Sequence, residues 1–354
     1  MNSTPRYATT LPFVSTALLV AAISPTTHAG ETRSGLIPAP ALDRWMYPFN
    51  STPGTKPTIS TFGSTPGAPE FDSRDGQMLV SFDVDEQIPS GLGASRYQIQ
   101  SLRVTVQFAN DQVVAYDPTI DPWQCFIDPA DPEWIADSDA GQPIELFGVG
   151  YRNGFSAVTF AENSPFTVPP NSPLAPGVRN AFAMSFDAGG APIDISNHPR
   201  ERFDPQAWAV GEIDGLEPGS LIPIDSLMHF DIDVSDPAIQ AHLRLGVDAG
   251  RLDFAISSLT FVVQQGGNFP TFYSKENAFV VLGFASAASL DYTVDILPLC
   301  DAADFNCDGA VDGDDLGTLL GFWGPCPAPC AADLNEDGAV DGDDLGSLLG
   351  AWTN

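Results

Sequence analysis

LRVTVQF, residues Leu102–Phe108, alternates apolar and polar side chains over its whole length. Because successive side chains of an extended chain point to opposite faces, this pattern gathers the apolar ones on a single face. That face carries Leu102, Val104, Val106 and Phe108. The stretch therefore predicts a half-buried strand of an antiparallel sheet, with one face on the core and the other in water.

Similar short runs recur through the chain, with 32 Gly and 32 Pro to supply turns. They are MLVSFDV (78–84), IELFGVG (144–150), FSAVTF (155–160), AFAMSF (181–186), LMHFDIDV (227–234) and SLDYTVDI (289–296). In LDFAISSLTFVV (252–263) the alternation changes phase at Ser257 and Ser258, which predicts a β-bulge. A single helix is predicted after Asp236, a good N-cap followed by Pro237, with Gly250 able to end it.

These elements predict a mainly β fold: an antiparallel, jelly-roll-like β-sandwich over Gly30–Leu297, followed by a small all-α domain over Pro298–Asn354. The segment Asp117–Gly141 is rich in Pro and Asp and is expected to form a long surface loop. Asp137–Gly154 offers carboxylates for a further calcium ion, but its spacing matches no loop template, so a solvated turn is the alternative.

The chain is strongly acidic, with 46 Asp and Glu against 14 Lys and Arg and a formal charge of −32. Such a surface repels phosphate groups, so nucleic acid and anionic membranes are poor candidate partners. Divalent cations suit it better, and acidity that serves only to keep the protein dissolved is the simpler alternative.

The first 29 residues have the pattern of a signal peptide. Arg6 precedes the apolar run Leu11–Ile23, and Thr27-His28-Ala29 places small residues where a signal peptidase reads them. The run is shorter than the roughly 20 apolar residues of a membrane anchor. We therefore expect cleavage after Ala29 and a secreted or cell-surface protein without a membrane span.

The C-terminal part of the chain is an internal duplication. DFNCDGAVDGDDLGTLLGFWG (304–324) returns as DLNEDGAVDGDDLGSLLGAWT (333–353), identical at 16 of 21 positions. An EF-hand calcium loop needs oxygen ligands at positions 1, 3, 5, 9 and 12, a carbonyl at 7 and Gly at 6. Both copies fill every position, which predicts two Ca²⁺ ions. The ligands would be Asp304, Asn306, Asp308, Ala310, Asp312 and Asp315, and then Asp333, Asn335, Asp337, Ala339, Asp341 and Asp344.

Each loop runs into an apolar stripe at helical spacing. The stripes are Leu316, Leu319, Leu320 and Trp323, and Leu345, Leu348, Leu349 and Trp352. No helix is expected before either loop. Each repeat is thus half an EF-hand that cannot bury its stripe alone, so the two are expected to pack antiparallel about a pseudo-twofold axis.

Four of the five cysteines lie around the duplication, at Cys300, Cys307, Cys326 and Cys330. Three disulfide pairings are possible, and the sequence does not choose among them. Zinc is a weaker alternative, because no CxxC pair or nearby His is present. Cys125 stands alone.

From Cys300 to Asn354 the chain resembles the dockerin domains of secreted polysaccharide-degrading systems. The resemblance rests on the duplicated DxNxDGxVDxxD loop, which ends in Asp, and on the missing entering helices. It implies binding to a cohesin-like protein and attachment to a scaffold or cell surface. In that family loop positions 10 and 11 select the partner, and here they are Gly313-Asp314 and Gly342-Asp343. Their identity would let either copy dock, and a calcium-dependent plug without a partner is the alternative.

The body contains no GxSxG, HExxH or phosphate-binding Gly loop, and His198, His229 and His242 are its only histidines. It also resembles, more loosely, the DNRLRE-type β-sandwiches of secreted bacterial proteins, through MLVSFDV with IQSLRVTVQF and FYSKEN with ASLDYTV. That resemblance implies carbohydrate binding and a structural ion pair between Lys275 and Glu276. Trp123 and Trp134 are the better candidates for stacking on sugars.

The sequence thus predicts a secreted, calcium-binding protein of polysaccharide utilisation, with a carbohydrate-binding body and a dockerin-like tail. Two alternatives stay open. One is a glycoside hydrolase or polysaccharide lyase, whose pair of carboxylates cannot be chosen among so many. The other is a structural protein of the cell envelope.

Overall fold

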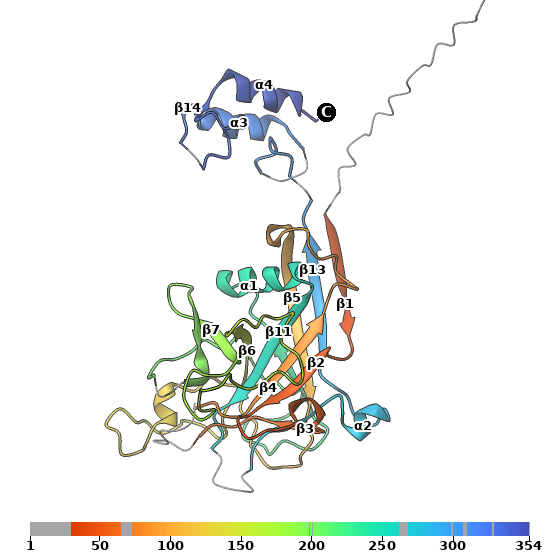
Figure 1. Cartoon of the computed structure of the whole chain (residues 1–354), viewed down its shortest axis with the longest axis vertical. Helices are drawn as coiled ribbons and strands as arrows, with labels where there is room; N and C mark the ends of the chain where they lie inside the picture. The colour runs from red at the N-terminus through yellow and green to blue at the C-terminus, as the bar shows by residue number, and fades with distance from the viewer. Residues whose placement is uncertain are drawn as a thin grey trace, which may run out of the picture. The chain divides into compact units, whose positions relative to one another are not determined.

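In the computed structural model, Leu102–Gln107 form the last part of β5 (Tyr97–Gln107), and Phe108 follows this strand directly. The four apolar side chains of LRVTVQF are all buried, so the predicted alternation is confirmed. β5 is a central strand of a four-stranded antiparallel sheet with the order β1-β13-β5-β10 (Figure 1). Its other members are β1 (Glu31–Ile37), β10 (Leu227–Asp231) and β13 (Ser289–Ile296).

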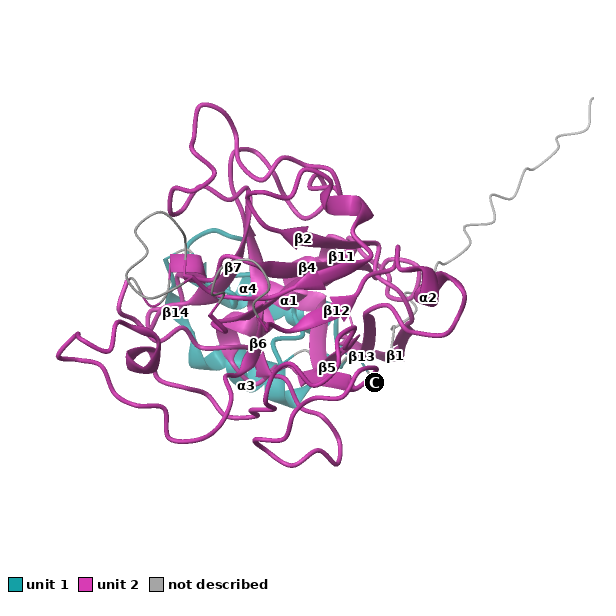
Figure 2. Cartoon of the chain, turned by 90° about the horizontal axis from the view of Figure 1, so that it is seen from below, with its two compact units in different colours: residues 1–29, 299–354 teal, residues 30–298 magenta. Residues whose placement is uncertain are grey.

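The structure describes residues 30–64, 73–197, 199, 201–261, 268–298, 300–306, 310–327 and 329–353. The predicted signal peptide, Met1–Ala29, lies outside these residues. By its contacts the chain divides into two compact units, Gly30–Pro298 and the C-terminal residues 299–354 (Figure 2). No helix within the described ranges combines the length and the apolar character needed to cross a membrane.

A second antiparallel sheet has the order β2-β4-β11-β6-β7-β8, and a short strand, β9, also pairs with β6. Its strands are β2 (Leu42–Met46), β4 (Gln77–Asp83), β6 (Ile144–Tyr151), β7 (Ala181–Phe186), β8 (Pro192–Asp194), β9 (Ala209–Val210) and β11 (Arg251–Ser258). The body is therefore mainly β, as predicted.

The two sheets share one apolar core. Val104 and Leu290 of the four-stranded sheet belong to the same buried cluster as Val80 and Phe254 of the larger one. On the other face of β11, Ala255 lies in a second cluster, which includes residues of the segment between β6 and β7. The larger sheet is thus covered on both faces.

This double burial explains why the predicted bulge at Ser257 and Ser258 is wrong. The strand stays in register with β6 through both residues and with β4 as far as Ser257, and every side chain from Leu252 to Ser258 is buried. In a strand covered on both faces, apolar and polar residues need not alternate, so a change of phase in the alternation does not indicate a bulge. The register shift lies instead in β5, opposite Thr293 and Val294.

The predicted strand Phe155–Phe160 is also wrong, because this segment forms turns. Ser156 N donates to Thr159 Oγ1 at 2.8 Å, and Phe160 N donates to the Ser156 carbonyl at 2.9 Å. Such local bonds from Ser and Thr compete with a sheet ladder. The apolar residues still serve the fold, since Phe160 is buried in the second cluster.

The predicted helix of the body is α1 (Pro237–Asp248), which packs against β5 and β11. Asp236 Oδ1 accepts hydrogen bonds from Ala238 N and Ile239 N, and Gly250 has a φ of +83° just beyond its end. This confirms both predicted ends. The remaining body elements are β3 (Thr58–Ser60), which pairs with β12 (Thr271–Tyr273), the short helix α2 (Ala278–Val281), and 3-10 turns at Pro53–Thr55, Ala94–Arg96, Trp123–Phe126 and Ile195–Asn197.

The C-terminal unit contains two helices of equal length, α3 (Gly313–Gly321) and α4 (Gly342–Gly350). The strands β14 (Gly324–Pro325) and β15 (Ala339–Val340) form its one sheet within the described residues. Each helix begins inside one copy of the repeat, at loop position 10. The helices therefore follow the loops, as predicted from the leucine spacing.

His242 of α1 makes the stability of the body dependent on pH. Its ring lies 5.3 Å from that of Trp208 and 6.2 Å from that of Phe186, and burial lowers its pKa to about 4. An unfolded chain, with a pKa near 6.5, binds this proton more readily, so stability is lost as the pH falls from about 6.5 towards 4. Between pH 7 and 4.5 we expect wild type to lose about 2 kcal/mol more than His242→Phe. Urea denaturation of both proteins measures this, and equal losses would contradict it.

Candidate metal sites

The second acidic loop is described over its whole length and turns as a calcium loop does. Gly338, at position 6, has a φ of +93°, in the region that favours glycine. Asp333, at position 1, is buried and accepts hydrogen bonds from Asp337 N at 3.1 Å and from Gly338 N at 2.8 Å. The turn thus folds back onto the first carboxylate of the loop.

Asp344, at position 12, is fully buried and holds the loop to the helix. It accepts hydrogen bonds from Leu334 N at 2.7 Å, from Asn335 N at 3.2 Å and from Asp341 N at 2.8 Å. Burial acts to raise the pKa of Asp344, but the backbone N–H groups outweigh it, and the pKa lies below its usual value. The carboxylate therefore stays ionised at neutral pH, and its free lone pairs can still face a cation.

The first loop repeats this arrangement where it is described. Asp315 is fully buried and accepts from Phe305 N at 2.7 Å and from Asp312 N at 3.0 Å. Asp304 is buried as well. Asp308, at position 5, lies outside the described residues together with its neighbours Cys307 and Gly309.

The exposed ligand candidates of the second loop lie apart from its buried carboxylates. Asp337 accepts from Ala339 N and from the Asn335 side-chain amide, each at 3.0 Å. Within the part of the chain that the structure describes, three acidic groups approach within 4.8 Å of one another only in the body. Each repeat of the tail thus has two buried carboxylates, at loop positions 1 and 12, and Asp337 would have to turn inward to complete a site.

The two repeats of the tail are related by a twofold pattern. Its buried core consists of Ala303, Val311, Leu319, Ala332, Val340 and Leu348, which form three pairs at the repeat offset of 29 residues. Gly324, after α3, pairs with Val340 in the second loop. Thr353, after α4, donates its N–H to the Val311 carbonyl in the first loop at 3.0 Å. The end of each helix therefore lies beside the loop that precedes the other helix. The two helices run antiparallel.

Only half of each predicted stripe is buried. Leu319 and Leu348 lie in the core, whereas Leu320 and Trp323 are each 50% exposed and Leu349 is 52% exposed. Helices of nine residues that cross once cannot cover a stripe of four large side chains on both partners. Gly313, Asp314, Gly342 and Asp343, the residues with a predicted role in partner choice, are all exposed in the first turns of the helices.

The tail cysteines that the structure describes, Cys300, Cys326 and Cys330, are in disulfides. Cys326 and Cys330 form a bridge that closes the connection between the repeats, and Cys300 is disulfide-bonded as well. Cys125, in the body, is a free thiol. Burial, together with the nearby carboxylates of Asp121 and Asp137, raises its pKa to about 11.

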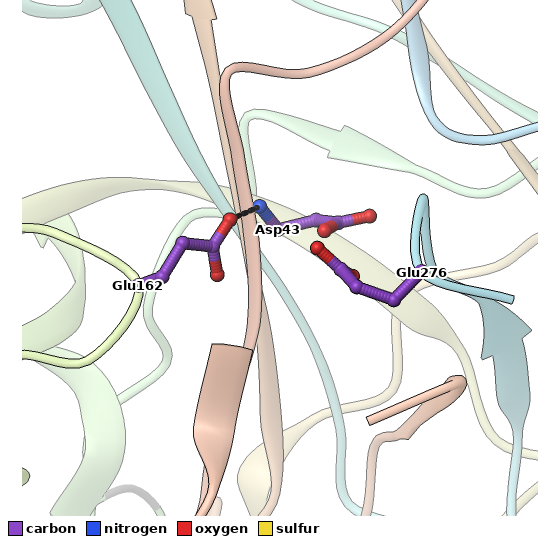
Figure 3. A group of neighbouring side chains, drawn as sticks. All are labelled: Asp43, Glu162 and Glu276. Atoms are coloured by element: carbon purple, nitrogen blue, oxygen red, sulfur yellow. Dashed lines mark hydrogen bonds between the residues drawn. The ribbon is translucent and has the colours of Figure 1, made fainter. Parts of the chain in front are cut away.

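One of the two acidic groups in the body consists of Asp43, Glu162 and Glu276 (Figure 3). Asp43 is 1% exposed, its N–H donates to Glu162 Oε1 at 3.1 Å, and its Oδ2 accepts from Lys275 N at 2.7 Å. The Lys275 ammonium contacts the Glu162 carboxylate and lies 3.7 Å from Asp43 Oδ1 and 3.9 Å from Glu276 Oε1. The protein supplies the cation here, and the predicted pair of Lys275 and Glu276 is present.

The other group consists of Asp117, Asp121 and Asp139, all in the acidic segment 117–141 that joins β5 to β6. Of these three residues, only Asp139 belongs to the segment Asp137–Gly154, which the sequence suggested for a further calcium ion. Asp117 and Asp121 were missed as ligands, because their partner Asp139 lies about 20 residues away and no local template connects them.

A pocket with a volume of about 700 Å³ lies beside this segment. Its lining includes Phe186, Phe203, Asp187, Glu201 and Asp204. Asp204 Oδ1 accepts a hydrogen bond at 2.8 Å from the backbone N–H of Trp123, a residue predicted to contact sugars. Trp134, the other candidate, is 37% exposed.

Other tryptophans of the body, Trp45 and Trp208, pack against neighbouring side chains. Trp208 is 1% exposed, and Trp45 stacks on Tyr47 with ring centroids 4.7 Å apart. His229 lies in β10, with its Nδ1 2.9 Å from Thr105 Oγ1, and His198 lies outside the described residues.

No family model matches this chain, and no curated protein matches it either.

The Lys275 cluster yields a prediction for stability. Lys275→Met removes the ammonium and leaves three carboxylates crowded around Asp43, whose pKa burial already raises to about 7. Because an uncompensated buried charge is costly, we expect a loss of about 3 kcal/mol in the free energy of unfolding at pH 8. Urea denaturation measures it. Lys56→Met, at a partly exposed lysine, is the control and should change stability by less than about 0.5 kcal/mol. Equal effects of the two variants would contradict the assigned role.

Proposed function

We propose that this chain is a secreted calcium-binding protein of polysaccharide utilisation. Its body is a β-sandwich that binds carbohydrate, and its dockerin-like tail attaches it to a cohesin-like protein or a cell-surface component. The observation that carries the proposal is the twofold tail, in which both repeats anchor the carboxylate at position 12 by backbone N–H groups at the start of a helix.

Bound calcium would supply stability that the small core of the tail does not provide. This core has six small or medium-sized buried residues, too few to stabilise a unit of about 55 residues without help. A divalent cation in each loop would neutralise the crowded carboxylates and tie position 1 to position 12. Binding of two Ca²⁺ ions would then contribute directly to the stability of the tail.

The tail also carries an exposed surface suited to a partner. Leu320, Trp323, Leu349 and Trp352 are exposed apolar side chains that form two pairs at the repeat offset. Exposed aromatic and leucine side chains that recur in one small unit are typical of interaction surfaces. Gly313-Asp314 and Gly342-Asp343 add an acidic group at the start of each helix.

Carbohydrate binding by the body is supported by its architecture and by the pocket near Trp123. Two sheets around one core are the framework of many binding modules, and a likeness of this kind is analogy only. Aromatic faces next to carboxylates suit sugars, since the rings stack on C–H faces while the carboxylates accept hydrogen bonds from hydroxyls. The pocket combines Phe186 and Phe203 with Asp187 and Asp204 in this way.

The same pocket supports the second candidate function, a glycoside hydrolase or lyase. Several carboxylates, among them Asp187, Glu201 and Asp204, line one cavity, and two are enough for acid–base hydrolysis of a glycosidic bond. A structural role in the cell envelope is the outcome if the body neither binds nor cleaves polysaccharide.

For the tail, we expect calcium to raise the melting temperature of the full-length chain. At 100 times the dissociation constant each site contributes about 2.7 kcal/mol. Calorimetry with calcium and then with a chelator measures the shift, which Asp315→Asn/Asp344→Asn should abolish.

The matched control, Asp314→Asn/Asp343→Asn, alters the exposed neighbours of the same residues. It should keep the calcium shift and weaken calcium-dependent capture by a panel of cohesin modules. A melting curve that the chelator leaves unchanged would remove the basis of the tail's role.

For the body, the full-length chain should bind at least one member of a panel of insoluble polysaccharides, measured by depletion from solution. Binding without release of soluble sugar supports the binding module, whereas newly released reducing ends or unsaturated products would establish the enzyme. Because stacking on an aromatic ring contributes about 1 kcal/mol, Trp134→Ala should weaken binding by roughly fivefold. Phe279→Ala, at an exposed aromatic residue of α2, is the control and should leave the affinity unchanged.

A further inference from the structure

The acidic segment 117–141 is a long connection with little internal structure. Its only regular element within the described residues is the 3-10 turn Trp123–Phe126. Ordering such a loop costs conformational entropy, so a compact domain needs a specific contact to hold its ends. The two ends meet at Thr119, whose Oγ1 lies 2.6 Å from Asp117 Oδ1 and 3.2 Å from Asp139 Oδ2. A hydroxyl has one hydrogen and cannot donate fully to both carboxylates.

Three carboxylates converge at this point. One oxygen each of Asp117, Asp121 and Asp139 lies within 4.8 Å of the other two. Asp117 is only 4% exposed, Asp121 is partly buried and Asp139 is exposed. The group therefore has a buried side and a side open to solvent.

Thr119 N and Oγ1 both donate to Asp117 Oδ1, but two other oxygens of the group have no donor. Asp117 Oδ2 and Asp121 Oδ2 are both shielded from solvent, and neither has a hydrogen-bond partner. Buried carboxylate oxygens without a donor or a cation are costly, because they lose water and gain nothing in return. In the described part of the chain no Lys, Arg or His forms an ion pair with these three side chains. The Lys275 cluster, by contrast, contains its own ammonium.

Other negative charges add to the strain at this point. Burial raises the pKa of Asp121 to about 7, with further contributions from Asp137, Asp117 and Asp139. Burial also raises the pKa of Asp117. Burial is the largest cause of both shifts, and the neighbouring carboxylates add to it.

We propose that Asp117, Asp121 and Asp139 form a third Ca²⁺ site, in the body, which closes the acidic segment at its two ends. Oxygens around one Ca²⁺ ion, each at 2.3–2.6 Å, lie at most about 5 Å apart, as these do. The ligands are hard carboxylate oxygens, which favour Ca²⁺ over zinc. The solvent-exposed side, at Asp139, leaves room for water to fill the remaining coordination positions.

The site would connect calcium to the pocket. Asp121 lies two residues before Trp123, whose N–H is bonded to Asp204 at the pocket lining. An ion on Asp121 would therefore fix the start of the 3-10 turn and, through it, the position of Trp123. This gives the body a calcium dependence separate from that of the tail.

The number of ions bound by the full-length chain tests the proposal. Equilibrium dialysis against Ca²⁺, followed by elemental analysis, should show one ion fewer in Asp117→Asn/Asp121→Asn than in wild type. The difference is one whether or not the tail loops bind calcium, so failure of the proposed tail function leaves this test intact. Asp128→Asn, at an exposed residue of the same segment, is the control and should bind as many ions as wild type.

Hydrogen exchange locates the effect. Calcium should slow exchange in peptides from 117–141 by at least tenfold in wild type and in the tail variant Asp315→Asn/Asp344→Asn, but not in Asp117→Asn/Asp121→Asn. In chelator the body variant should melt at a higher temperature than wild type, because it lacks the repulsion, and with calcium at a lower one. A merely structural pair of aspartates would not give this change of sign. If the double variant fails to fold, Asp139→Asn at the exposed ligand takes its place.

An unchanged ion count, or exchange in 117–141 that does not respond to calcium in wild type, would overturn the proposal. Equal protection by Mg²⁺ at the same concentration would overturn the assignment to Ca²⁺.

Discussion

Repulsion between carboxylates brought together by folding is the constraint on which the functional regions of this chain depend. The protein meets it in three ways. Around Asp43 it places the ammonium of Lys275 among three acids. At Asp315 and Asp344 it directs backbone N–H groups onto a buried carboxylate. At Asp117 and Asp121 it leaves oxygens without any donor. In the first case the protein supplies a cation of its own, and the other two leave the negative charge available to a bound cation.

The parts of the fold that could be predicted from sequence are those specified by residues close together in the chain. The alternation in β5, the Asp236 cap of α1 and the spacing of the two acidic loops are all local patterns, and each appears at its expected place. Where burial depends on distant partners, local patterns failed. β11 is covered on both faces, so its lost alternation did not mean a bulge, and the hydroxyls of Ser156 and Thr159 turned an apparent strand into turns.

The acidic groups of the body show the same limit. Asp43 and Glu162 are 119 residues apart, and Asp117 and Asp139 are joined only through the folding of a long loop. With 46 acidic residues in the chain, sequence alone offers no reason to choose these. The repeats of the tail could be recognised because duplication places each predicted ligand at a fixed offset, and the same offset relates the three pairs of its core. The exposure of its leucines and tryptophans was not predicted. Helical spacing shows which residues share one face of a helix, but not how much of that face the other short helix covers.

Cys125 shows a further effect of the acidic surroundings. Thiol–disulfide exchange proceeds through the thiolate, and a pKa near 11 leaves about a hundredfold less of it than an ordinary thiol has at neutral pH. An odd cysteine would otherwise compete for the sulfurs that form the bridge between Cys326 and Cys330 while the chain oxidises. Burial, together with the negative charges around the loop, thus leaves the Cys125 thiol of the folded chain slow to attack that bridge.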